Sequence, residues 1–174
     1  MAVTQQLARV SAEYLAACRR SAEESPDGDP GWDRPPADVL DLDWAAAALL
    51  RTRERAGPDD LQLNALRDAT SGDPNVDVGY LNTHPHAIGP FGPAATAVTP
   101  VQVTRISDLL ADIDLPSLLA TRPADGPDLT ARTVDRAYGS GGASEAYLLE
   151  HLDALRAFYR EASRRRLHIV LWWD

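Results

Sequence analysis

The stretch that decides the fold is the C-terminal sequence 144-SEAYLLEHLDALRAFYREASRRRLHIVLWW-173, in which a helical pattern runs directly into a strand pattern. Apolar residues recur at helical spacing from Leu148 to Ala162, and Ser144 is suited to cap the first turn. The segment 167-LHIVLWW-173 is apolar at nearly every position, as is typical of a strand buried on both faces. The sequence therefore predicts a long C-terminal helix followed by a terminal strand that is covered on both sides.

The remainder of the chain predicts further helices and short strands around this unit. These are a strand at 4–10, a helix from Ser11, a helix from about Trp44 to Arg55 capped by Asp43, a shorter helix at about 59–69, a brief strand within 76–81, an extended segment at 95–98, and a helix opened by a Thr99–Gln102 capping box. This order indicates an α+β fold, in which a single domain spanning 1–174 packs several helices on a small mixed sheet. A Gly/Pro-rich stretch at about 71–94 is expected to form a long loop.

Composition and charge exclude several classes of protein. All 17 basic residues are arginine, so chemistry that needs a lysine amine, such as Schiff-base catalysis, is excluded. The net charge is −9, and residues 21–80 carry 14 Asp and Glu against five Arg. This acidity argues against nucleic-acid binding, which depends on clustered basic residues. An acidic face could meet a basic protein partner, or it could serve only to keep the protein soluble.

The expected location is the cytoplasm. No apolar run approaches the roughly 20 residues of a membrane span. The N-terminal sequence lacks the basic start and apolar run of a secretion signal. Cys18 is the single cysteine, so no internal disulfide can form, and we expect a buried, inert thiol.

The candidate metal site lies in 80-YLNTHPHAIGPFGP-93. In an extended segment His84 and His86 project to the same side and could share a Zn²⁺ ion, which needs three or four ligands. The fold would have to supply the missing ligand, from Asp73, Asp77 or His151. A polar loop without a metal explains the same residues, and no cofactor is indicated.

Three further patterns admit a functional and a structural explanation. Asp41 and Asp43 could form a carboxylate pair for acid/base work or Mg²⁺, or Asp43 could cap a helix. The glycine-rich run at 138–147 could bind an anion or only connect to the last helix. Arg164–Arg166 complement the dipole at the end of that helix, and Trp172 and Trp173 belong to the core or to an oligomer interface.

Four segments together resemble the YfbM-like proteins, a bacterial domain family of unknown function: 7-LARVSAEYLAAC-18, 39-VLDLDWAAAALL-50, 90-PFGPAATAVTPVQVTRISDLLADID-114 and 147-YLLEHLDALRAFYREASRRRLHIVLW-172. The resemblance implies a single α+β domain and supplies no activity, cofactor or substrate. In the family, the helix after Leu-Asp-[Leu/Ile]-Asp usually carries a Trp and often a His one turn further on. Here Trp44 follows Asp43 immediately and a bare Ala-rich run comes next, so this aromatic/His cluster is simplified.

We therefore expect an uncharacterised YfbM-like protein that acts more through binding than through catalysis. One form of this hypothesis is an immunity- or antitoxin-like protein whose acidic face meets a basic partner. The alternative is a small hydrolase or metal-dependent enzyme that uses the His84/His86 loop together with Asp77. A homo-oligomer formed through the last strand or helix is a third hypothesis.

Overall fold

The centre of the molecule is a four-stranded sheet in the order β2-β1-β4-β3. The computed structural model describes residues 3–55, 60–82, 88–89, 92–120 and 144–174. The strands are β1 (Gln5–Val10), β2 (Val39–Asp43), β3 (Thr96–Val98) and β4 (His168–Trp173). The α+β class is confirmed, but the mixed sheet expected from the sequence is wrong in detail, since all three strand pairings are antiparallel. Strand direction depends on long-range pairing, which a local apolar pattern does not encode.

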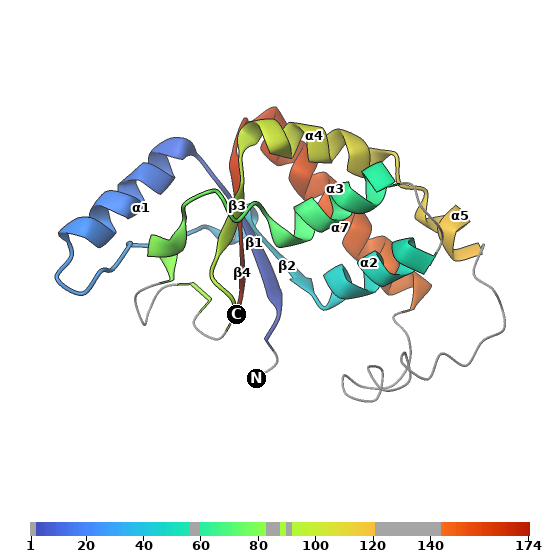
Figure 1. Cartoon of the computed structure of the whole chain (residues 1–174), viewed down its shortest axis with the longest axis horizontal. Helices are drawn as coiled ribbons and strands as arrows, with labels where there is room; N and C mark the ends of the chain where they lie inside the picture. The colour runs from blue at the N-terminus through green and yellow to red at the C-terminus, as the bar shows by residue number, and fades with distance from the viewer. Residues whose placement is uncertain (1–2, 56–59, 83–87, 90–91, 121–143) are drawn as a thin grey trace.

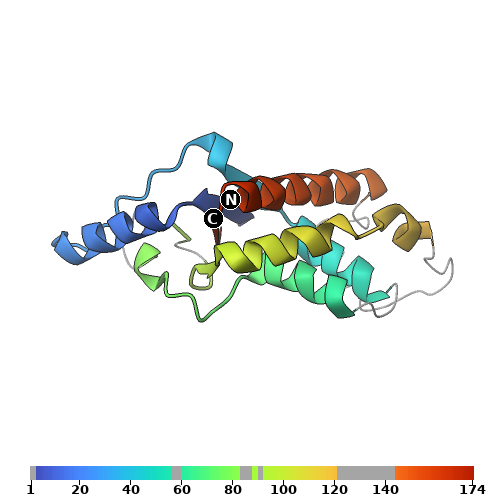
Figure 2. The same ribbon diagram turned by 90° about the horizontal axis from the view of Figure 1, so that it is seen from above.

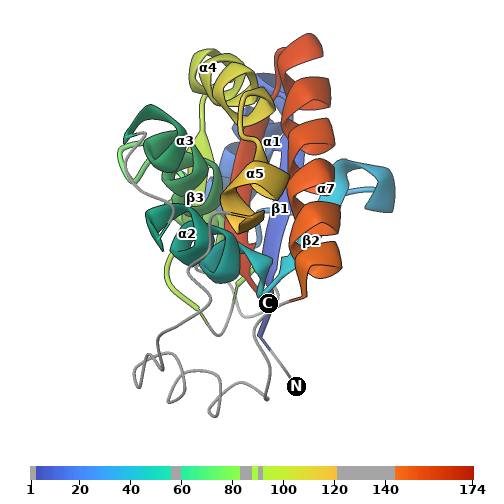
Figure 3. The same ribbon diagram turned by 90° about the vertical axis from the view of Figure 1, so that its right-hand side faces the viewer.

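Helices cover the two faces of this sheet unequally. One face carries α2 (Ala45–Arg55), α3 (Asp60–Ser71), α4 (Pro100–Ala111), α5 (Leu115–Ala120) and α7 (Glu145–Arg164), as Figures 1 and 3 show. The other face carries α1 (Ala12–Glu24) and the short 3₁₀ helix η2 (Gly79–Leu81). A second 3₁₀ helix, η1 (Pro36–Asp38), leads into β2. Seen from above, α4 and α7 run side by side (Figure 2).

Strand β4 is buried on both faces, as its sequence predicts. Ile169 and Leu171 belong to the larger apolar cluster under α7, whereas Val170 and Trp172 belong to the smaller cluster under α1. Successive strand side chains point to opposite faces, so this one strand joins the two clusters.

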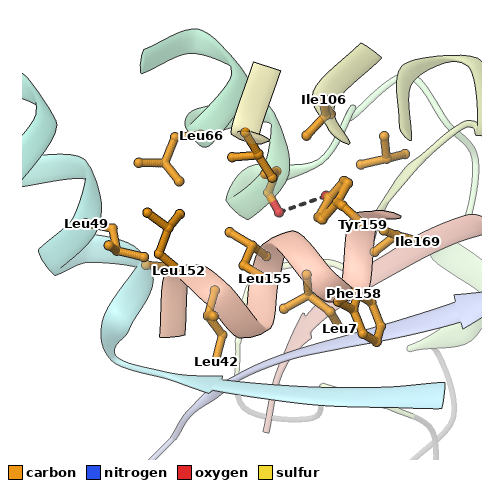
Figure 4. Packing of buried hydrophobic residues seen from close by; sticks show 14 of the residues in the cluster. Leu7, Leu42, Leu49, Leu66, Ile106, Leu152, Leu155, Phe158, Tyr159 and Ile169 are labelled. Atoms are coloured by element: carbon orange, nitrogen blue, oxygen red, sulfur yellow. Dashed lines mark hydrogen bonds between the residues drawn. The ribbon is translucent and has the colours of Figure 1, made fainter. Parts of the chain in front are cut away.

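Tyr159 of α7 lies at the middle of the larger cluster (Figure 4). Its side chain is fully buried, and its hydroxyl donates a 2.9 Å hydrogen bond to the carbonyl of Ala69. Ala69 belongs to the last turn of α3, where carbonyls lack a partner within the helix. The tyrosine therefore satisfies a helix end inside an apolar core and ties α3 to α7.

The helix starts agree with the local sequence signals. Ser11 and Ser144 accept hydrogen bonds from the backbone N–H groups three residues on, and Thr99 and Gln102 form the expected capping box. Cys18 is buried on the apolar side of α1, as its spacing predicts.

One strand was not predicted, and one local prediction is wrong. Residues 39–43 form the edge strand β2, for which no element was expected. Residues 79–81, expected within a brief strand, form η2 instead. In the described part of the 71–94 segment, Val78, Leu81 and Ile88 are buried in the smaller cluster. Among the described residues, no helix has the length and apolar character needed to cross a membrane.

Candidate functional site

The candidate site lies at the end of the sheet where β2 and β4 end and β1 begins. Asp43 is paired with Gln5 across the β1–β2 ladder, and Gln5 is paired with Trp173 across the β1–β4 ladder. Close by, the backbones of Thr4 and Asp174 exchange two hydrogen bonds, of 2.7 and 3.0 Å. The pairing therefore brings Asp43 and Trp173, which are far apart in sequence, to one end of the molecule.

Asp43 has a left-handed backbone conformation. Its φ is +50°, a region that L-residues other than Gly, Asn and Asp rarely adopt. The Asp41 carboxylate accepts a 2.8 Å hydrogen bond from the Asp43 N–H, which closes an Asx turn between β2 and α2. The turn fixes the positions of two carboxylates that are two residues apart. The Asp43 carboxylate itself accepts a hydrogen bond from another element rather than serving as the helix cap expected from the sequence.

That other element is the first turn of α7. The Tyr147 hydroxyl donates a 2.9 Å hydrogen bond to Oδ2 of Asp43. Burial raises the pKa of Tyr147 to about 12, and the hydrogen bond and charge of Asp43 act in the same direction. At neutral pH the phenol therefore remains protonated and donates to the carboxylate. This pair positions a negative charge and is a poor general base.

His151 lies one turn further along α7. Its ring centroid is 4.1 Å from that of Tyr147, and its Nδ1 is 2.8 Å from the Tyr147 carbonyl oxygen. A carbonyl can only accept, so Nδ1 of His151 carries the hydrogen of this bond. The histidine thus packs as a polar extension of the Tyr147–Asp43 pair.

Two indole rings lie at the same end of the sheet, one from Trp44, which follows Asp43 in the chain, and one from Trp173, whose strand partner Gln5 also pairs with Asp43. Trp44 is 39% exposed, and its ring centroid lies 6.1 Å from that of half-buried Trp173. Asp41 is exposed as well. We call Asp41, Asp43, Trp44, Tyr147 and Trp173 the acidic aromatic edge. Carboxylates beside exposed indole faces are suited to bind cations, arginine above all, through ion pairs and cation–π contacts.

The residues that the sequence suggested as metal ligands do not belong to the acidic aromatic edge. His84 and His86 lie outside the described residues. Asp77 forms a 2.8 Å ion pair with Arg19, whose hydrogen bond and charge lower the pKa of Asp77. Hydrogen bonds from Asn75 and Gln102 lower the pKa of Asp73. Within the described ranges, no group of three or more His, Cys, Asp or Glu side chains is placed to hold a metal ion.

The remaining candidates from the sequence lie in different parts of the molecule. Burial raises the pKa of the Cys18 thiol, which keeps it in its less reactive protonated form. Residues 138–143 of the glycine-rich run lie outside the described part of the chain. Trp172 is buried, with its ring centroid 5.8 Å from that of Trp32, whereas Trp173 belongs to the acidic aromatic edge. Arg164 forms an ion pair with Glu161 on its own helix.

Tyr147 and Asp38 were not identified from the sequence. Tyr147 lies 104 residues from its partner Asp43, and Asp38 lies 127 residues from Arg165, with which it forms a 2.8 Å ion pair. Neither pair leaves a local pattern. The one usable signal was the alternation of Leu and Asp in 40-LDLD-43, which fits an edge strand with carboxylates on its open side.

Comparison with known proteins supports the fold and leaves the activity open. No family model matches the sequence, and no curated protein matches it. Among solved structures, the crystal structure of YfbM from Escherichia coli, a protein of unknown function, is similar with a TM-score of 0.54. The match covers 98% of this chain and 99% of YfbM at 15% sequence identity, a level that establishes the fold alone. The resemblance inferred from the sequence is thus confirmed at the level of structure: the chain has a YfbM-like fold.

Proposed function

We propose that this protein acts by binding a basic protein partner at the acidic aromatic edge. The observation that carries the proposal is that two carboxylates, held by an Asx turn and by Tyr147, directly precede the partly exposed Trp44 at one end of the sheet. An immunity- or antitoxin-like protein that neutralises a basic partner would use such a surface.

The chemistry of the edge suits arginine more than a simple cation. The fork of a guanidinium can pair with the exposed carboxylate of Asp41 while its plane stacks on an indole face. The contact with Trp44 adds about 0.5–1 kcal/mol at an exposed site. The strongly acidic 21–80 segment, to which Asp41 and Asp43 belong, attracts a basic partner over a longer range and speeds association.

The Tyr147–Asp43 pair favours binding over catalysis at this edge. A phenol whose pKa is raised to about 12 does not take up a substrate proton at neutral pH. The same hydrogen bond holds the Asp43 carboxylate in one orientation before a partner arrives, which lowers the entropy lost on binding.

The proposal is tested by affinity capture from cell extract with matched variants. The test variant is Asp41→Asn/Asp43→Asn, which removes two charges and retains oxygen acceptors for the turn and for Tyr147. The control is Asp108→Asn/Asp112→Asn, which removes two charges from exposed positions at the end of α4.

We expect a protein that the wild type and the control retain, that the test variant loses, and whose retention weakens as salt is raised. An arginine-rich peptide, followed by fluorescence anisotropy, should show at least a fivefold loss of affinity for the test variant only. Equal losses of affinity in the test and control variants would contradict the proposal, because the edge would then contribute only through the net charge of the protein. Retention that is insensitive to salt would also contradict the proposal.

A further inference from the structure

A second charged cluster lies around Asp38, where η1 leads into β2. Three arginines from three parts of the chain surround this one carboxylate: Arg165 at 2.8 Å, Arg34 at 3.0 Å and Arg9 at 3.4 Å. Arg9 belongs to β1, Arg34 to the segment before η1, and Arg165 is the residue that caps the C-terminus of α7. We call these four residues the arginine cluster.

The arginine cluster carries two positive charges in excess. Asp38 neutralises one guanidinium, which leaves two unbalanced in a protein with a net charge of −9. Glu161 accepts two hydrogen bonds, of 2.7 and 2.9 Å, from Arg164, and its carboxylate also feels the charges of Arg165 and Arg9. Among the described residues, the ion pairs of Arg9, Arg34 and Arg165 all end on Asp38.

The cluster also has more hydrogen-bond donors than acceptors. The Nε atom of Arg34 is buried and lacks a hydrogen-bond partner within the described structure, and the buried Nε of Arg9 lies 3.4 Å from Oδ1 of Asp38 without forming a hydrogen bond. A buried donor without an acceptor costs about 1–3 kcal/mol, more when it is charged. Arg9 also donates to the Ala37 carbonyl, so its guanidinium has one further acceptor besides Asp38.

The guanidinium groups are held in place by aromatic rings. Arg9 lies 4.7 Å from the centroid of the Phe158 ring, and Arg34 lies 4.5 Å from that of Tyr14. Their side chains are only 11% and 15% exposed, whereas Arg165 is 41% exposed and forms the solvent side of the cluster. The cluster therefore consists of two inner cations held against aromatic rings and one accessible outer cation.

We propose that the arginine cluster binds an oxyanion of the phosphate class. Two excess positive charges match a dianion better than a monoanion, and a tetrahedral oxyanion offers enough acceptors for several guanidinium forks. Arg165 contacts the anion from the solvent side, and Arg9 and Arg34 contribute charge from beneath. The ligand is either free phosphate or the phosphoryl group of a small molecule. This site is separate from the acidic aromatic edge and does not depend on its function.

Binding is measured on the whole chain by titration calorimetry and by thermal unfolding at constant ionic strength. The probes are inorganic phosphate, glycerol 3-phosphate, and acetate as a monoanion control. We expect phosphate to raise the melting temperature as its concentration increases, and acetate to leave it unchanged. Tighter binding of inorganic phosphate would assign the free ion, and tighter binding of glycerol 3-phosphate would assign a phosphorylated small molecule.

Variants of two neighbouring arginines distinguish specific binding at the arginine cluster from general attraction to the basic end of α7. Arg165→Ala should weaken phosphate binding about tenfold, roughly the loss of one charge-assisted hydrogen bond. Arg164→Ala removes the neighbouring charge, which is already paired with Glu161, and should leave the affinity unchanged. Arg34→Ala serves as a second test if Arg165→Ala does not fold.

Equal weakening by Arg164→Ala and Arg165→Ala would overturn the proposal. A rise in melting temperature that is the same for phosphate and acetate would overturn it as well, and so would the absence of any response to phosphate or glycerol 3-phosphate.

Discussion

The left-handed conformation of Asp43 gives a sharp prediction about stability. Three substitutions separate its two features, the positive φ and the hydrogen bond from Tyr147. Asp43→Asn retains both a residue that tolerates this conformation and an acceptor for the phenol. Asp43→Gly keeps the tolerance and loses the acceptor, and Asp43→Ala loses both. The expected order of stability is wild type close to Asn, then Gly, then Ala.

The magnitudes follow from the geometry. A residue with a Cβ in the left-handed region costs about 1–2 kcal/mol, so the Ala variant should be less stable than the Gly variant by about 1 kcal/mol. Loss of the Tyr147 hydrogen bond costs about 0.5–1.5 kcal/mol, because the half-buried phenol can still reach water. The Asn variant should lie within about 0.5 kcal/mol of wild type. Asp43→Ala should therefore lose about 2 kcal/mol in all.

Urea unfolding followed by circular dichroism measures these differences, and thermal unfolding provides a second readout of about 2–4 °C per kcal/mol for a chain of this length. Equal stability of Asp43→Ala and Asp43→Gly would refute the argument from backbone conformation. An Asn variant as unstable as the Gly variant would refute the role assigned to the hydrogen bond.

Four other substitutions test the fold away from this site. Gly72→Ala should lower the free energy of unfolding by about 2–4 kcal/mol, because Gly72 has φ +68° and a Cβ there would lie 2.8 Å from the Cβ of Thr96. Gly28→Ala is the matched control, because Gly28 has φ +79° but lies in open space. It should cost only about 1 kcal/mol in the same urea assay. Tyr159→Phe should lose about 1–2 kcal/mol, since it leaves a buried helix-end carbonyl without its donor, and an unchanged urea midpoint would contradict this. Burial lowers the pKa of His168 in the folded chain below its ordinary value of 6.5. As the pH decreases through 6.5, the unfolded chain therefore binds a proton at this residue more readily than the folded chain does, and the free energy of unfolding falls. His168→Gln should flatten the urea-midpoint profile between about pH 5 and 7, and an equally steep profile would show that another group is responsible.

The sequence predicts those parts of the fold that depend on neighbouring residues. The caps at Ser11, Thr99 and Ser144, and the passage from α7 to β4, are visible because each is a local pattern of a few residues. Strand β2 was missed because its identity depends on pairing with β1. Only Leu42 of its five residues is both apolar and buried. Short edge strands carry little local signal.

The candidate sites were harder to predict than the fold, for a physical reason. The acidic aromatic edge and the arginine cluster each join an aspartate next to β2 with a side chain of α7 more than 100 residues away. Such contacts exist only once the helix has packed against the strand, and no spacing rule in the sequence reports them. The sequence drew attention instead to His84 and His86, whose pattern is local and which lie outside the described residues.

The two clusters occupy opposite ends of the same helix–strand unit. Tyr147 lies in the first turn of α7 and Arg165 caps its last turn, so about 27 Å of helix separates them. Asp43 ends β2, and Asp38 directly precedes it. At physiological ionic strength charges are screened beyond about 8 Å, so neither cluster weakens the other. Helix α7 thereby has carboxylates near one end and an excess of guanidinium groups at the other. A chain with an excess of nine negative charges can therefore have both the proposed cation-binding edge and the proposed anion-binding cluster.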